Sequence, residues 1–246
     1  MIKNPEEIKM MREGGKILAR ILKELAKTVR PSISTKYLDD LAVTLAIKHK
    51  ASPSFKNYNG YPHATCISVN EEVVHNMPSQ DKILKEGDIV GIDFGLWYKG
   101  LCTDMAVTVP VGKVSKQAKK LIKVTKKALE IGLKQAKAGN TIGDVGFAIE
   151  QFVLKGGFSV VKTLTGHGVG HQVHEEPKIP NFGEPGRGVR LEEGMTLAIE
   201  PMVNIGRHEV RTKEDGWGIV TNDSSLSAHF EHTVAVTKKG YEILTK

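Results

Sequence analysis

The 246-residue sequence contains very little cysteine, and this scarcity limits what the chain can be. Cys66 and Cys102 are the only two cysteines, and they do not form a C-x-x-C pair. Disulfide-held small folds and thiolate zinc sites both need more cysteines at closer spacing, so we exclude both classes. Two isolated thiols are typical of a protein that works in a reducing cytoplasm.

Long apolar runs are also absent. No stretch approaches the roughly 18 apolar residues of a membrane span, so we expect no membrane association. Residues 1–7 include three charged residues and lack the apolar centre of a secretory signal. With 40% hydrophobic and 26% charged residues, the composition is that of a globular protein long enough for one large domain.

Positive charge is in moderate excess, with a net charge of +7 and a pI near 9.2. Lysines are densest over residues 113–137, where a helix is predicted. A solvated helix face is the simpler interpretation, and a weak, transient attraction to the ribosome surface or another nucleic acid is the alternative. No basic motif interleaved with aromatic residues strengthens that alternative.

Capping and stop signals predict two pairs of helices separated by short strands. Strands are expected where β-branched runs follow the helices. The predicted helices run from Asn4 to Pro31, from Ser34 or Thr35 onward, from Ser115 to about Gly139, and from Thr141 onward. The predicted strands are Ile89–Phe94, Ala106–Val111, Met195–Ile199 and Thr233–Thr237.

The two helix pairs and their strands repeat along the chain. Positions 93 and 200 are 107 residues apart, and positions 31 and 139 are 108 apart. We therefore expect an α+β fold, with one domain over residues 1–246 built from halves of about 1–112 and 113–246.

An acidic pattern recurs in both halves. Asp93 and Glu200 each lie six residues after a glycine, and Asp104 and Glu231 each precede a β-branched run. A hairpin turn near residues 96–100 would bring Asp93 and Asp104 together. Carboxylates inside apolar runs cannot remain charged unless a cation neutralises them. The repeated pattern therefore predicts a cavity that holds a pair of divalent metal ions.

Three histidines lie within the glycine-rich segment 166–174. A helical zinc pair is disfavoured by the glycines, and a phosphate loop lacks its usual Lys-Ser/Thr. We expect an extended strand in which His167 and His171 share one side and His174 faces elsewhere. His167 is then the predicted ligand, His174 leans over a substrate, and His171 has a supporting role. His75 and His174 both occur in a V-H-x-x-P motif, so His75 is predicted to be a functional residue as well.

Four carboxylates and one imidazole form a hard, oxygen-rich ligand set. Such a set suits Mn²⁺, Fe²⁺ or Co²⁺ at least as well as Zn²⁺. Two ions of this kind can share a hydroxide and polarise a carbonyl group. The chemistry indicated is hydrolysis without a nucleophilic side chain, since no G-x-S-x-G motif or Cys-His signature is present.

With these motifs in order, the sequence resembles the type I methionine aminopeptidases of the bacterial, single-domain kind over essentially its whole length. The resemblance implies the pita-bread fold, with two pseudo-symmetric halves around a dimetal site. The matching stretches are Asn59–Pro62, Cys66–Glu71, Gly87–Val90, Ile92-Asp93, Gly166–Gly170, His174–Pro177, Ile199–Met202 and Glu231–Thr233.

The resemblance also implies residue roles. Asp104 and Glu231 would bridge the two ions, and Glu200 would shuttle a proton from the attacking water. His174 would stabilise the oxyanion, and His75 would hydrogen-bond the substrate backbone. The implied metal ligands are Asp93, Asp104, His167, Glu200 and Glu231.

A methionine pocket is implied as well, with a requirement for a small second residue. Nascent polypeptides would be the substrate and the protein a monomer. Val173 stands where relatives often have phenylalanine, which predicts a roomier wall, and Phe94-Gly95 replaces a polar residue near one metal. The implied pocket residues are Phe55, Tyr58, Tyr61, Cys66, Met202 and Trp217.

Other proteins of the same fold are the alternatives to this interpretation. Xaa-Pro aminopeptidases and prolidases share the ligand set but usually have an extra N-terminal domain, which we do not expect here. A non-catalytic binding protein would have lost ligands that this chain keeps. A type II enzyme would need a long insertion for which residues 201–230 leave no room.

Overall fold

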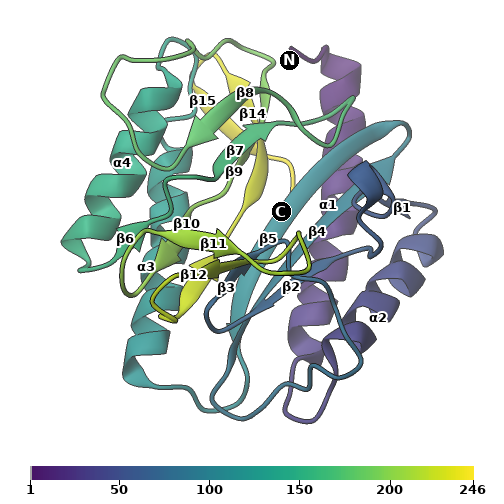
Figure 1. Ribbon diagram of the computed structural model, residues 1–246. Coiled ribbons are helices and arrows are strands. Elements are labelled where there is room, and N and C mark those ends of the chain that lie inside the picture. The colour runs from purple at the N-terminus through teal and green to yellow at the C-terminus, as the bar shows by residue number, and fades with distance from the viewer. Residues whose placement is uncertain (1) are drawn as a thin grey trace.

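The computed structural model describes residues 2–246. Helices α1 and α2 lie on one side of a central layer of antiparallel strands, and α3 and α4 lie on the other (Figure 1). The expected α+β layering is confirmed. Within residues 2–246, no helix combines the length and the apolar character needed to cross a bilayer.

The first helix pair begins where the capping signals predict. The Asn4 side chain accepts a hydrogen bond from the Glu7 amide, and the Glu7 carboxylate accepts one from the Asn4 amide. The Ser34 hydroxyl, rather than that of Thr35, caps the second helix. The elements of this half are α1 Pro5–Thr28, α2 Thr35–Lys48, β1 Ser52–Pro53, the short 3-10 helix η1 Tyr58–Gly60, β2 Cys66–Val69, β3 Glu72–Val74, β4 Ile89–Tyr98 and β5 Leu101–Pro110.

The hairpin of β4 and β5 is longer than the sequence predicted. Its two central turn residues are Lys99 and Gly100, which have φ values of 50° and 80°. Positive φ at both positions gives the tight turn that matches strand twist, so pairing continues to Tyr98 and Leu101. The strand predicted to end at Phe94 therefore runs four residues further.

The second half repeats the helix pair, but α3 ends earlier than expected. It stops at Leu133, where the Gln135 and Ala136 amides bond to carbonyls three residues back, at Gly132 and Leu133, instead of four. The elements of this half are α3 Lys116–Leu133, α4 Ile142–Lys155, β6 Ser159–Val160, β7 Thr165–Gly168, β8 Glu175–Pro180, β9 Thr196–Ile199, β10 Met202–Asn204, β11 Val210–Thr212, β12 Ile219–Thr221, β13 Ser227–His229, β14 His232–Thr237 and β15 Gly240–Ile243.

Each helix pair covers its own apolar core. Residues of α1 and α2 pack on β2 and β4, while residues of α3 and α4 pack on β9, β10 and β14. The halves meet where β5 lies beside β14. There the Asp104 amide donates to Thr233 Oγ1 at 2.8 Å, and the same hydroxyl donates to the Asp104 carbonyl at 2.8 Å. The Glu231 amide bonds to the Ala106 carbonyl at 2.9 Å. This seam holds acidic residues of both halves side by side.

Candidate metal centre

One cavity of about 200 Å³ collects all the predicted ligands. They come from β4 and β5 of a four-stranded sheet, from β7 of a five-stranded sheet, and from the residues that follow β9 and precede β14 of that second sheet. The ligand residues that line the cavity are Asp93, Asp104, His167, Glu200 and Glu231.

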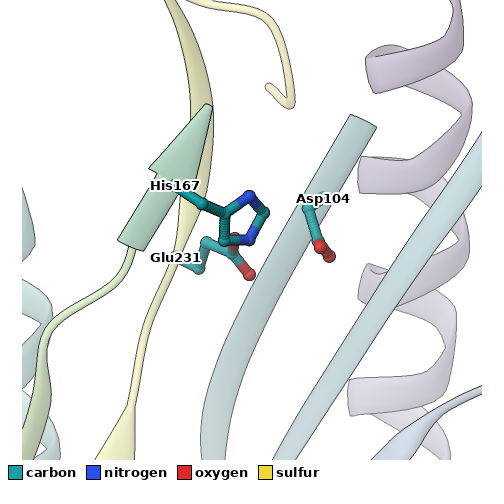
Figure 2. Close-up of side chains that lie close together, drawn as sticks. All are labelled: Asp104, His167 and Glu231. Atoms are coloured by element: carbon teal, nitrogen blue, oxygen red, sulfur yellow. The ribbon is translucent and has the colours of Figure 1, made fainter. Parts of the chain in front are cut away.

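Three of these residues form the tightest cluster. Single ligand atoms of Asp104, His167 and Glu231 all lie within 4.8 Å of one another. In Figure 2 the Asp104 carboxylate on β5 and the Glu231 carboxylate, just before β14, lie near the His167 ring. All three residues are buried. One cation could therefore contact all three side chains.

Burial raises the pKa of all four carboxyl groups that line the cavity, and repulsion by neighbouring carboxylates adds to this at Asp93, Asp104 and Glu231. Burial and the Glu200 charge raise the pKa of Asp104 to about 8, and burial raises that of Glu200 to about 8. Burial, together with neighbouring carboxylates, also holds the pKa values of Asp93 and Glu231 well above their usual range.

Two carboxylate oxygens of the cluster also lack partners. Among residues 2–246, Asp93 Oδ1 and Glu231 Oε1 are buried without a hydrogen-bond donor. Buried polar oxygens normally have a partner. A divalent cation would supply it and would favour the charged carboxylates, so the donor set fits such an ion.

Glu200 lies between two histidines, one of which the sequence analysis missed. Its carboxylate oxygens are 3.5 Å from His167 Nε2 and 3.4 Å from His229 Nε2. His229 is 3% exposed, and burial lowers its pKa to about 3. His229 is two residues before Glu231, and in extended chain this spacing puts both side chains on one side. That spacing was the signal that could have identified it.

His75 and His174 line the same cavity. The ring centroids of His174 and His167 are 4.3 Å apart. Burial, together with the nearby His174 and His229, lowers the pKa of His75 to about 4, and burial lowers that of His174. Both rings are therefore neutral near pH 7 and can donate an N–H bond. His75 has a φ of 58°, which is uncommon for a residue other than glycine and frequent at functional sites.

The extended strand expected through residues 166–174 is wrong beyond Gly168. Strand β7 ends there, and the chain turns before β8 begins at Glu175. His171 therefore does not share a face with His167. Its Nε2 lies 2.7 Å from Glu7 Oε1 on the surface, while His174 returns to the cavity.

An aromatic wall completes the cavity. The Tyr61 ring meets the Trp217 ring edge-on at 5.1 Å, and the Tyr58 ring meets His174 in the same way at 5.2 Å. The wall residues that line the cavity are Phe55, Tyr58, Tyr61, Cys66 and Trp217.

Met202 and Val173 do not line this cavity, although Val173 packs in the same apolar cluster as Phe55, Tyr61 and Cys66. Met202 lines an adjoining cavity of about 450 Å³ that also contacts His75, His174 and Glu200. Val173 lines a separate hollow beside Tyr58. The roomier wall predicted from Val173 stays a prediction.

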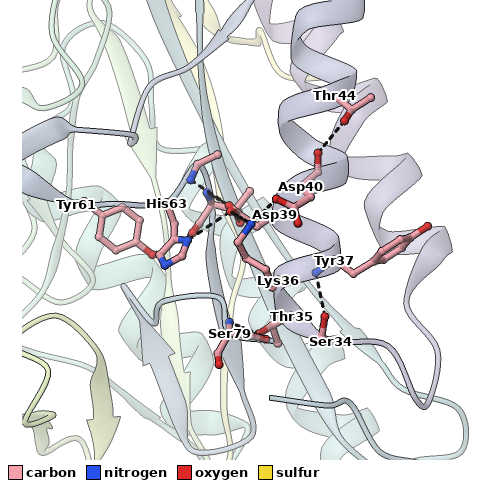
Figure 3. Close-up of polar contacts among 12 residues, drawn as sticks. Ser34, Thr35, Lys36, Tyr37, Asp39, Asp40, Thr44, Tyr61, His63 and Ser79 are labelled. Atoms are coloured by element: carbon pink, nitrogen blue, oxygen red, sulfur yellow. Dashed lines mark hydrogen bonds and ion pairs between the residues drawn. The ribbon is translucent and has the colours of Figure 1, made fainter. Parts of the chain in front are cut away.

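A buried carboxylate on α2 anchors the wall, and the sequence analysis missed it. Asp39 Oδ1 accepts hydrogen bonds from the Ala64 and Thr65 amides at 3.0 and 2.9 Å (Figure 3). The Tyr61 hydroxyl donates to the Thr65 carbonyl at 3.0 Å. In the sequence, Asp39 beside Asp40 has the appearance of an ordinary surface acid of a helix.

The fold and the acidic cluster together define a metallopeptidase. The sequence pattern of metallopeptidase family M24 matches residues 9–238, and the chain belongs to that family. It is 49% identical to a methionine aminopeptidase of Clostridium perfringens, over 100% of this chain and 98% of that protein.

Solved structures agree with this assignment. A methionine aminopeptidase of Thermotoga maritima superposes with a TM-score of 0.98 at 48% identity, over 100% of this chain and 99% of that one. A Xaa-Pro dipeptidase of Bacillus anthracis reaches a TM-score of 0.80 at 25% identity, and the match covers 100% of this chain but 62% of that longer one. The resemblance to methionine aminopeptidases, the pita-bread fold and the expected class, a metal-dependent aminopeptidase, are thereby confirmed.

Proposed function

We propose that this chain removes the N-terminal methionine from nascent polypeptides whose second residue is small, by attack of water on the first peptide bond. The observation that carries the proposal is one cavity in which a carboxylate–histidine cluster adjoins an apolar aromatic wall. The cluster supplies the chemistry, and the wall selects the side chain to be removed.

Two divalent ions would be held by the five ligand residues, of which Asp104, His167 and Glu231 lie closest together. When bound, these ions would polarise the scissile carbonyl and lower the pKa of water. The hard donor set supports Co²⁺, Mn²⁺ or Fe²⁺ at least as well as Zn²⁺.

The remaining steps belong to side chains of this chain. Glu200 accepts a proton from the attacking water and passes it to the departing amine. The neutral His174 ring donates a hydrogen bond to the developing oxyanion. His75 hydrogen-bonds the backbone beside the scissile bond, which fixes its orientation.

The methionine side chain would lie against the aromatic wall. A thioether is apolar and polarizable, and it packs well on aromatic rings and sulfur. The limited volume beside the cluster would exclude a large second side chain. The proposed pocket residues are Phe55, Tyr58, Tyr61, Cys66 and Trp217, with Met202 contributing from the adjoining cavity.

We propose that the chain acts in the cytoplasm, as a monomer with one catalytic domain over residues 1–246. Both cysteines are free, which is consistent with a reducing compartment. The proposed ligands all come from a single chain, so catalysis needs no second copy.

Transient ribosome association is a further part of the proposal. The segment 113–137 contains nine lysines, all exposed, and one acid, Glu130, so its charge is +8 while the rest of the chain has a net charge of −1. Such a stripe would attract the phosphate backbone of ribosomal RNA. Ribosome binding that weakens steeply with salt, and that is lost in Lys119→Glu/Lys123→Glu, would support it. Binding unchanged in that variant would contradict it.

The test of the activity compares two peptides on metal-stripped protein reloaded with Co²⁺, Mn²⁺ or Fe²⁺. Met-Ala-Ser should release free methionine only with metal, and Glu200→Gln should abolish release. Glu184→Gln changes an exposed acid that lines neither the metal-lined cavity nor the adjoining one, so it is the matched control and should retain activity.

Other outcomes favour the rival readings. Cleavage of only a Xaa-Pro peptide would place the chain with the prolidases, whose fold it shares. Failure to cleave either peptide with any metal, by protein shown to be folded, would favour a non-catalytic binding role.

A further inference from the structure

A lysine near the start of the chain lies beneath the loop that carries His174. Lys3 is 2% exposed, and its Nζ is 2.8 Å from Glu175 Oε2. Its amide bonds to the Gly194 carbonyl at 2.8 Å, which fixes it beside the turn before β9. A lysine buried to this degree is rare unless its charge is paired.

Glu175 uses its second oxygen to hold the loop itself. Oε1 accepts hydrogen bonds from the backbone amides of His171 at 2.6 Å and of Gln172 at 3.2 Å. Burial alone would raise the pKa of this carboxyl group, but the bond from Lys3 and the other donors lower it to about 2. The charged carboxylate therefore joins the loop to the first residue of β8.

The backbone of the loop packs closely against the aliphatic part of the Lys3 side chain. Gly170 has a φ of 147°, and a Cβ at that position would lie 2.2 Å from Lys3 Cε. Glycine is thus required by both conformation and space. The Gly170 carbonyl accepts a bond from the Cys102 amide at 2.7 Å, so the loop lies between β5 and the N-terminal segment.

The same segment holds the loop at a second point. His171 Nε2 is 2.7 Å from Glu7 Oε1, while the other oxygen of Glu7 accepts from the Asn4 amide at 2.8 Å. His174 therefore lies between His171, which contacts Glu7, and Glu175, which pairs with Lys3. The His174 ring lies edge-on against the rings of His167 and Tyr58, with centroid distances of 4.3 and 5.2 Å.

Buried ion pairs add little net stability, because desolvation offsets their attraction, but they can fix one conformation. We infer that Lys3, acting through Glu175, is a positioning residue that sets where His174 lies against the metal-lined cavity. The inference rests on the proposed aminopeptidase activity, in which His174 contacts the substrate.

The test is a double-mutant cycle on the full chain loaded with metal. Lys3→Met keeps the apolar stem and removes the charge, and it should lower kcat for Met-Ala-Ser roughly tenfold, as for other residues that orient a catalytic group. KM and the affinity for Mn²⁺ should change little, since no pocket residue or ligand is altered. In a His174→Ala background, Lys3→Met should change kcat less than about twofold, because its effect acts through that ring.

Lys99→Met is the matched control. It removes a lysine–glutamate pair of 2.7 Å that also involves α1 but is exposed, so kcat should stay within about twofold of the parent. If Lys3→Met does not fold, His171→Ala removes the second contact at the surface, and it should lower kcat by a smaller factor that again vanishes in the His174→Ala background.

Three results would overturn the inference: additive effects of Lys3→Met and His174→Ala on kcat, a parallel loss of Mn²⁺ affinity, or a lower Tm with kcat unchanged. Failure of the parent protein to release methionine would instead contradict the proposed function. The two failures are therefore distinguishable.

Discussion

The two halves of the molecule bring a pair of acids to one site by different connections. In the first half, Asp93 and Asp104 lie on β4 and β5, which a two-residue turn joins. In the second half, β9 and β14 pair directly, so Glu200 and Glu231 are close although residues 201–230 lie between them. Strand pairing, and not the length of the connection, determines where the carboxylates lie.

The longer connection of the second half contributes to the cavity. It forms β10 to β13, and the turn between β11 and β12 brings Trp217 to the aromatic wall. The second half also supplies the histidines His167, His174 and His229. The first half therefore provides two carboxylates, His75 and most of the aromatic wall, and the second half provides two carboxylates, Trp217 and most of the histidines.

Removal of one proposed metal-ligating acid from each half should have the largest effect. Asp104→Asn and Glu231→Gln each remove a ligand that is at most 3% exposed. Each should lower kcat for Met-Ala-Ser on the order of 10³-fold, because metal stabilisation is worth several kcal/mol of the barrier. Steady-state kinetics at saturating Mn²⁺ measures this. A large loss of kcat in only one of the two variants would contradict the proposal that the two halves contribute equivalent acids.

The paired histidines should differ in importance. His174→Ala removes the proposed oxyanion donor and should lower kcat roughly 10²–10³-fold. His75→Ala removes one hydrogen bond to the substrate backbone and should cost about tenfold in kcat/KM. If the two variants lower kcat and kcat/KM by the same factors, both rings serve the same step.

The stability of the metal-free protein should depend on pH through acids of both halves. Their pKa values are raised in the folded state, to about 8 for Asp104 and Glu200, so the folded protein binds more protons than the unfolded chain between pH 4.5 and 8. Stability should therefore fall as pH rises through that window. Thermal unfolding with and without Mn²⁺ tests this, since bound metal should remove most of the dependence.

The caps of the second helix in each pair should show the smallest effect. Ser34 and Thr141 are 107 residues apart and each accepts a bond from the amide three residues on. Ser34→Ala and Thr141→Ala should each lower the free energy of unfolding by about 1 kcal/mol. Urea denaturation of both variants, with activity retained, measures it. A difference of several kcal/mol would show that the two helix pairs are not equivalent.

Much of the fold and of the metal cluster could be predicted because the signals are local. The capping box at Asn4 and the acids within apolar runs are read directly from neighbouring residues. The resemblance to a known family added the order of the ligands and the names of the wall residues.

The parts that were missed depend on contacts between distant segments. Asp39 is buried because amides of residues 64 and 65 donate to it, and nothing near Asp39 in the sequence indicates this. The strand predicted beyond Gly168 is replaced by a turn because Lys3 and Glu175, 172 positions apart, occupy the space. Such contacts follow from tertiary packing rather than from sequence periodicity.

The central claim is that both halves build one centre for two metal ions. Titration calorimetry of metal-stripped protein with Mn²⁺, checked by elemental analysis, tests it most directly. Two ions should bind per chain, and both Asp93→Asn from the first half and His167→Ala from the second should weaken binding or reduce the number bound. Fewer than two ions in the parent, or a variant of either half that binds both ions unchanged, would contradict the account.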